Sequence, residues 1–267
     1  MSTAVVQRDM SLTYDLKKAW IRNEFDILLQ PQIEADSRRI AGFEALLRWR
    51  HPRKGIILPE DFLPVAEELD LTRRLDYLVF DKVCAFLHKR LEDHKELFCV
   101  SSNFARAHFF EKDFVLRLEK IRNKYQIPAR YLAIEMLEGS SFADVDLVQE
   151  VVMELKARGY SVYLDDCGGA DFNVGDLMLQ NVTHIKIDKH VVDKINQENV
   201  QVLLRGLCAM IHRMSYKVIC EGIETLEQLN LAKKLGVDMI QGYYFYKPMN
   251  LLRAEVLYDV MSANEST

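Results

Sequence analysis

The fold is decided by residues 98–136, which read FCVSSNFARAHFFEKDFVLRLEKIRNKYQIPARYLAIEM. The stretch opens with an apolar, β-rich run at 98–104 and returns to one at 131–136. Between them, residues 114–121 place apolar side chains at helical spacing. An amphipathic helix between two short buried strands is typical of a strand–helix–strand unit with parallel strands.

The same alternation continues along the whole chain. Apolar, β-rich runs predict eight strands, at 27–33, 40–49, 98–104, 131–136, 161–164, 183–187, 217–220 and 239–244. Dividing 267 residues among eight units leaves about 33 residues each, the size of one strand–helix repeat. The first two strands are separated only by residues 34–39, which is too short for a parallel crossover. We therefore predict an α/β fold, a (β/α)8 TIM-like barrel with an antiparallel first strand.

Local signals predict the boundaries of the domain and of some helices. Residues 1–22 are expected to form a lead-in helix, residues 23–262 the barrel, and residues 263–267 a C-terminal tail. Gly159 and Gly236 each come after a basic last helical turn, as glycines at helix C-termini do. Thr225 and Gln228 have the spacing of a capping box at a helix start.

Composition excludes several classes of protein. Apolar residues make up 49% and charged residues 28%, which excludes wholesale disorder. The net charge of −5 makes duplex nucleic acid an unexpected partner. The five cysteines form no C-x-x-C pair and are expected to be reduced thiols of a cytosolic protein. No apolar stretch approaches a membrane span and the start lacks a signal-peptide pattern, so we expect cytoplasmic localisation.

Polar side chains lie at or near the ends of seven predicted strands, where the active sites of such barrels lie. They are Glu44, Asn103, Glu135, Asp165 with Asp166, Lys186, Glu221 and Gln241. Carboxylates that converge on one mouth repel one another unless cations lie between them. Oxygen ligands without Cys or His select hard ions, Mg²⁺ or Mn²⁺. Two such ions form the clamp that phosphodiester hydrolysis uses, and adjacent Asp165 and Asp166 could bridge them.

Eight short motifs in this chain match those of a known family of domains. The chain resembles the EAL domain, the bacterial cyclic di-GMP phosphodiesterase family, over nearly its whole length. The motifs are LQP at 29–31, EALLRW at 44–49, SNF at 102–104, IEMLE at 134–138, LDD at 164–166, IKID at 185–188, EGIET at 221–225 and QGY at 241–243.

The resemblance implies a role for each matching residue. The implied ligands of two divalent ions are Glu44, Asn103, Glu135, Asp165 and Asp166. Glu221 is implied as the general base, and Lys186 as the residue that orients the attacking water. The implied substrate-binding residues are Gln30, Arg48 and Gln241. Glu138 and Glu224 are implied to support a loop of the site.

The chain departs from the family in the loop after Asp166. The family usually reads DDFGTGYSSL there, whereas residues 165–174 are DDCGGADFNV, and Leu137 replaces a threonine.

The leading hypothesis is a Mg²⁺- or Mn²⁺-dependent phosphodiesterase that converts cyclic di-GMP to linear pGpG. The protein is expected to be a homodimer with a regulatory domain or protein partner. The altered loop motivates two alternatives. One is a catalytically weak or inactive receptor for cyclic di-GMP, and the other is a protein-interaction domain that no longer engages nucleotide.

Overall fold

A computed structural model describes residues 10–137, 145–169 and 174–265. Its strands are β1 (Phe25–Glu34), β2 (Ile40–His51), β3 (Gly55–Ile57), β4 (Cys99–Phe104), β5 (Leu132–Met136), β6 (Ser161–Cys167), β7 (His184–Ile187), β8 (Lys217–Cys220) and β9 (Met239–Ile240). Its α-helices are α1 (Met10–Ala19), α2 (Pro59–Glu68), α3 (Thr72–Glu92), α4 (Phe114–Lys124), α5 (Val145–Ala157), α6 (Lys189–Val192), α7 (Glu198–Arg213), α8 (Leu226–Leu235) and α9 (Leu251–Glu265). Short 3₁₀ segments include η1 (Arg106–Phe110), η2 (Ala129–Tyr131) and η4 (Val174–Met178).

Eight of the strands close into a barrel. Their order is β1-β9-β8-β7-β6-β5-β4-β2, and β1 pairs again with β2 to complete the circle. β1 is antiparallel to both of its neighbours, whereas the other neighbouring barrel strands run parallel. The prediction of a TIM-like barrel with an antiparallel first strand is therefore confirmed.

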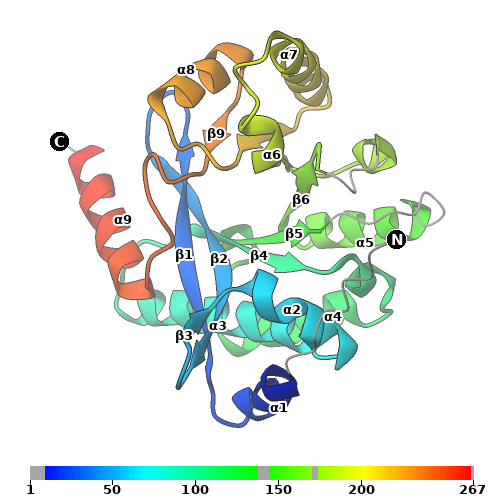
Figure 1. Cartoon of the computed structure of the whole chain (residues 1–267), viewed down its shortest axis with the longest axis vertical. Helices are drawn as coiled ribbons and strands as arrows, with labels where there is room; N and C mark the ends of the chain where they lie inside the picture. Colours follow the sequence, from blue (N-terminus) through cyan, green and yellow to red (C-terminus); the bar gives the residue numbers. More distant parts are fainter. Residues whose placement is uncertain (1–9, 138–144, 170–173, 266–267) are drawn as a thin grey trace.

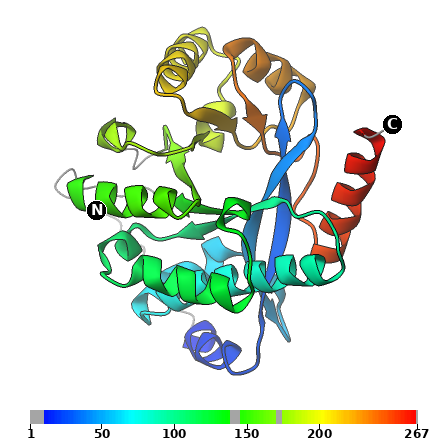
Figure 2. The same cartoon turned by 180° about the vertical axis from the view of Figure 1, so that it is seen from behind.

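The helices cover the outside of the barrel. In Figures 1 and 2, α7 and α8 lie at the top, whereas α2, α3 and α4 lie in the lower half with α1 beneath them. The large hydrophobic core packs helix residues such as Phe80 and Leu204 against outward-facing strand residues such as Ile134. A second, smaller cluster of Ala133, Tyr163, Ile219 and Met239 is separate from it. Because Ala133 shares a face of β5 with Glu135, this small cluster forms the layer directly beneath the site.

The predicted helix ends are present. Thr225 accepts from the backbone of Gln228 while the Gln228 side chain reaches back to Thr225, so the capping box begins α8. Gly236 ends α8 with a φ of 90°, the left-handed conformation that glycine adopts at least cost. α1 lies inside the range 1–22. Within the described ranges, no helix is both long and apolar enough for a membrane crossing.

The structure departs most clearly from the predicted elements at three places. β9 ends at Ile240 rather than at residue 244, because the chain turns at Gly242 and the amides of the following aromatic residues bond to loop carbonyls. β3 was not predicted, because its three residues form a strand only through antiparallel pairing with the end of β2. α9 continues to Glu265, into the range expected to be a tail.

Candidate active site

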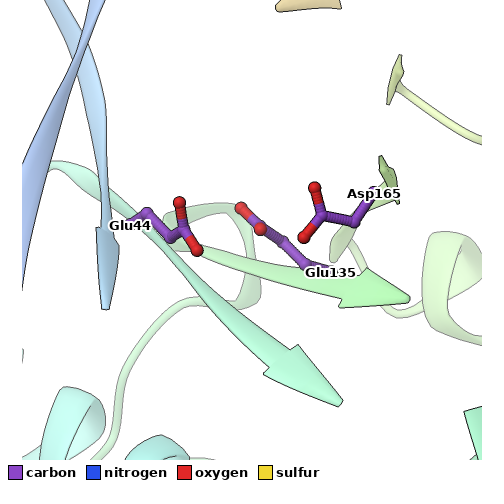
Figure 3. Close-up of side chains that lie close together, drawn as sticks. All are labelled: Glu44, Glu135 and Asp165. Atoms are coloured by element: carbon purple, nitrogen blue, oxygen red, sulfur yellow. The ribbon is translucent and has the colours of Figure 1, made fainter. Parts of the chain in front are cut away.

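Three carboxylates from separate strands converge at the mouth of the barrel. Glu44 comes from the middle of β2, Glu135 from β5 and Asp165 from β6. One oxygen from each lies within 4.8 Å of the others, and the three side chains point toward one another (Figure 3). All three are buried. Glu44 and Glu135 are 91 positions apart along the chain, and they meet only because β2, β4 and β5 run parallel side by side in the barrel.

A second carboxylate group overlaps the first. Asp165, Asp166 and Glu221 also each place an oxygen within 4.8 Å of the others. The pairing of β6 with β7 shifts register between Leu164 and Cys167, and Asp166 has a φ of 54°. This backbone breaks the alternation of a strand, so two consecutive aspartates serve one site. Asp165 belongs to both groups.

Lys186 lies among four of these acids. Its Nζ atom is 2.6 Å from Glu135 Oε2, 2.7 Å from Glu221 Oε1, 3.0 Å from Asp165 Oδ1 and 3.3 Å from Glu44 Oε2. The lysine side chain is only 1% exposed. One ammonium cannot neutralise four carboxylates, so the centre carries surplus negative charge in a place that water barely reaches.

The pKa values follow from this arrangement. Burial raises the pKa of Glu135 to about 8 and that of Asp166 to about 6, and neighbouring carboxylates add to both effects. Burial also raises the pKa of Glu221 well above its ordinary value. Burial alone would lower the pKa of Lys186, but the surrounding acids outweigh it and raise that pKa well above normal. The ammonium therefore stays charged, while the carboxylates resist full ionisation unless more positive charge arrives.

Amide side chains hold Glu44 in place. Asn103 Nδ2 donates to Glu44 Oε1 at 2.7 Å, and Gln241 Nε2 donates to Glu44 Oε2 at 2.6 Å. Burial opposes ionisation of Glu44, but Lys186 and these two amides lower its pKa. Gln241 Nε2 also lies 3.2 Å from Gln30 Oε1, and Gln32 Nε2 donates to Gln241 Oε1 at 3.2 Å. The second glutamine of β1 was not among the predicted residues, although its two-residue spacing from Gln30 places both on one face.

The donor set fits a hard divalent cation. Asn103 Oδ1 and Glu135 Oε1 are buried acceptor atoms that receive no hydrogen bond from the described residues. Buried acceptors are otherwise almost always satisfied. The ligand atoms that the two overlapping carboxylate groups offer are all oxygens, which is the chemistry that Mg²⁺ and Mn²⁺ prefer. The buried acidic cluster is thus consistent with a metal site.

A cavity of about 300 Å³ opens above these acids. Its lining residues are Gln30, Glu44, Leu46, Asp165, Lys186, Lys189, Glu221, Gly222, Glu224, Gln241, Gly242 and Tyr243. Arg48, predicted to bind a substrate phosphate, is half-buried and donates to the carbonyl of Leu47 at 2.7 Å rather than lining the cavity. Glu138 lies outside the described residues. Lys189 was not predicted, although it directly follows the IKID motif.

Fold and site together define a TIM-like barrel with an acidic, oxygen-lined centre at its mouth. Residues 14–248 match the family called EAL domain, and the chain belongs to this family. Among curated proteins, it is 29% identical over 245 residues to "Cyclic di-GMP phosphodiesterase PA2567" of Pseudomonas aeruginosa, covering 91% of this chain and 42% of that protein. It is 27% identical over 246 residues to "Oxygen sensor protein DosP" of Escherichia coli strain K12, covering 92% of this chain and 31% of that protein.

Solved structures agree with this assignment. The chain matches "PaMucR Phosphodiesterase, c-di-GMP complex" with a TM-score of 0.85 and 25% identity, covering 92% of this chain and all of that one. That relative is thus a phosphodiesterase that was solved with cyclic di-GMP. The present chain spans less than half of the length of either curated relative named above.

Proposed function

We propose that this chain is a metal-dependent phosphodiesterase that hydrolyses cyclic di-GMP to linear pGpG. The observation that carries the proposal is the pair of overlapping carboxylate groups that share Asp165, with Glu221 in the second group. Two adjacent cation positions suit in-line displacement at phosphorus. Membership of the EAL domain family and likeness to a phosphodiesterase solved with cyclic di-GMP support the choice of substrate.

The proposed ligands are the oxygen-bearing side chains of the mouth. Glu44, Asn103, Glu135 and Asp165 would hold one cation, and Asp165 with Asp166 would serve the second. When bound, the cations supply positive charge that stabilises the extra negative charge of the phosphoryl transition state.

Glu221 is the proposed general base. It borders the cavity, and burial raises its pKa well above its ordinary value, so it is a stronger base than an exposed glutamate once added positive charge keeps it ionised. The water oxygen then bonds to phosphorus while the bond from phosphorus to the 3′ oxygen breaks. The 3′ oxygen takes up a proton from solvent, and Glu221 releases its own proton to solvent. Lys186, 2.7 Å from Glu221, holds the base in position and keeps a positive charge beside the reacting phosphate.

The remaining substrate and partner assignments are part of the proposal. Gln30 and Gln241 line the cavity and would contact the dinucleotide. The role of Arg48 as a phosphate ligand stays a prediction. Glu224 also lines the cavity, and its role in supporting a loop of the site stays a prediction. The homodimer and the regulatory domain or partner stay predictions.

Chromatographic product analysis tests the proposal. The protein is incubated with cyclic di-GMP in excess Mg²⁺, in excess Mn²⁺ and in chelator, beside an Asp165→Asn control. We expect pGpG only with metal and only from the unsubstituted chain. Saturable calorimetric binding of cyclic di-GMP without turnover would instead favour a receptor. Absence of both binding and turnover would favour a protein-interaction domain.

A further inference from the structure

Lys189 is the solvent-facing cation of the catalytic cavity. Among the described residues that line this cavity, only Lys186 and Lys189 carry a positive charge. Lys186 is buried and surrounded by carboxylates, whereas the Lys189 side chain is 45% exposed. A ligand that enters the cavity can therefore reach the ammonium of Lys189.

The position of Lys189 is set by the start of helix α6 and by the packing of the aliphatic part of its side chain. It is the first residue of α6, which Asp188 begins by accepting from the backbone amide of His190. Its aliphatic stem lies against Gly222, where an added Cβ would come within 2.4 Å of Lys189 Cγ. Gly222 follows Glu221, the proposed base, so the stem packs beside the backbone that carries the base.

The present partners of Lys189 are weakly held. Its Nζ atom is 2.9 Å from Glu224 Oε1 and 3.0 Å from Asp193 Oδ1, and both acids are 46% exposed. Ion pairs at this exposure contribute little and are screened by salt. The ammonium can exchange these carboxylates for a phosphate oxygen at small cost.

The charges of the mouth and of the substrate call for a cation besides Lys186 and the metal ions. When fully ionised, the five acids of the mouth carry four more charges than the single ammonium of Lys186 neutralises; the acids are Glu44, Glu135, Asp165, Asp166 and Glu221. Two divalent cations would neutralise these four charges. Cyclic di-GMP carries two phosphodiesters, and only one is cleaved at a time, so the other phosphate needs its own positive partner.

We propose that Lys189 is a substrate-binding residue that leaves Glu224 and Asp193 to contact the phosphate of cyclic di-GMP that is not being cleaved. This inference rests on the proposed function. It assigns to Lys189 a contribution to substrate affinity, and to selectivity for a substrate with two phosphates over one with a single phosphodiester.

The experiment compares Lys189→Met with the unsubstituted chain. Methionine keeps an unbranched stem over Gly222 and removes the charge. Lys194→Met is the matched control, because Lys194 is an exposed lysine close in sequence that does not line the cavity. We expect Lys189→Met to raise KM for cyclic di-GMP about tenfold with kcat within about twofold, since the loss of one charged contact costs about 1.4 kcal/mol. For bis(p-nitrophenyl) phosphate, which has one phosphodiester, we expect unchanged KM. A KM for cyclic di-GMP within twofold of the unsubstituted chain overturns the proposal.

A double variant distinguishes a contact between Lys189 and the phosphate from mere neutralisation of Glu224 by Lys189. If Lys189 only screens Glu224, the double variant Lys189→Met with Glu224→Gln regains the original KM, and the proposal is overturned. If Lys189 touches the phosphate, KM stays raised in the double variant.

Failure of the proposed function can be distinguished from failure of this inference. If the unsubstituted chain shows no turnover, calorimetric affinity for cyclic di-GMP in Ca²⁺ replaces KM as the readout. Weaker binding by Lys189→Met than by Lys194→Met then supports the contact, and equal binding overturns it.

Discussion

Replacement of Lys186 by methionine should destabilise the protein strongly when divalent metal is absent. The Nζ atom lies 2.6 to 3.3 Å from oxygens of four buried or nearly buried carboxylates. Removal of one partner of a buried ion pair leaves an uncompensated charge and costs about 3–5 kcal/mol. For a domain of this size, each kcal/mol lowers Tm by about 2–4 °C, so we expect a fall of roughly 6–20 °C.

Urea denaturation and calorimetry in chelator measure this loss, with Lys194→Met as the control. The control lysine is exposed, and we expect its substitution to change the free energy of unfolding by no more than about 0.5 kcal/mol. Millimolar Mg²⁺ should stabilise Lys186→Met more than the unsubstituted chain, because the carboxylates no longer have an ammonium between them. A loss below about 1 kcal/mol in chelator would refute the reasoning that Lys186 holds the acids together.

Three further outcomes are expected. Mg²⁺ or Mn²⁺ at about 100 times Kd should stabilise the unsubstituted chain by about 2.7 kcal/mol in a thermal scan. Asp165→Asn loses a carboxylate common to both groups, so an equal effect on this variant would contradict the assignment of the metal site. Burial lowers the pKa of His184 to about 3, so the unfolded chain binds the proton more readily and stability falls as pH drops below about 6.5. Between pH 7 and pH 5 this group should cost about 2 kcal/mol, and a His184→Phe variant with the same acid sensitivity in denaturation would argue against it. Gly242→Ala should destabilise the protein by more than about 2 kcal/mol in urea, since the added Cβ would lie 2.1 Å from the carbonyl oxygen of Ile223; a neutral result would show that this turn can move.

Much of the barrel follows from local sequence patterns. Short apolar runs indicate buried strands, and apolar residues at helical spacing indicate amphipathic helices. Both patterns can be recognised because they involve only a few neighbouring residues. The short connection at residues 34–39 permits only an antiparallel pair, and β1 and β2 form one. The end of β9 could not be found in this way. Tyr243 to Tyr246 continue the apolar pattern of a strand, but Gly242 packs against Ile223, a contact between distant segments.

The candidate residues of the mouth were also chosen from the sequence, because polar groups at strand ends have no packing role in a barrel core. Their mutual arrangement was beyond the sequence. Neither the central position of Lys186 nor the sharing of Asp165 between two carboxylate groups is encoded in any local spacing. Lys189 was missed for the same reason, since an exposed lysine after a strand usually lies in solvent and only the cavity distinguishes it.

The sequence by itself determined the order of strands and helices, the antiparallel start and the types of residue at the strand ends, since each depends on interactions between near neighbours. Only the tertiary structure decided which oxygens lie within reach of one cation, which lysine is buried among acids and which faces the cavity. Those properties depend on distances of a few ångströms between segments far apart in the chain, and closure of the barrel sets them.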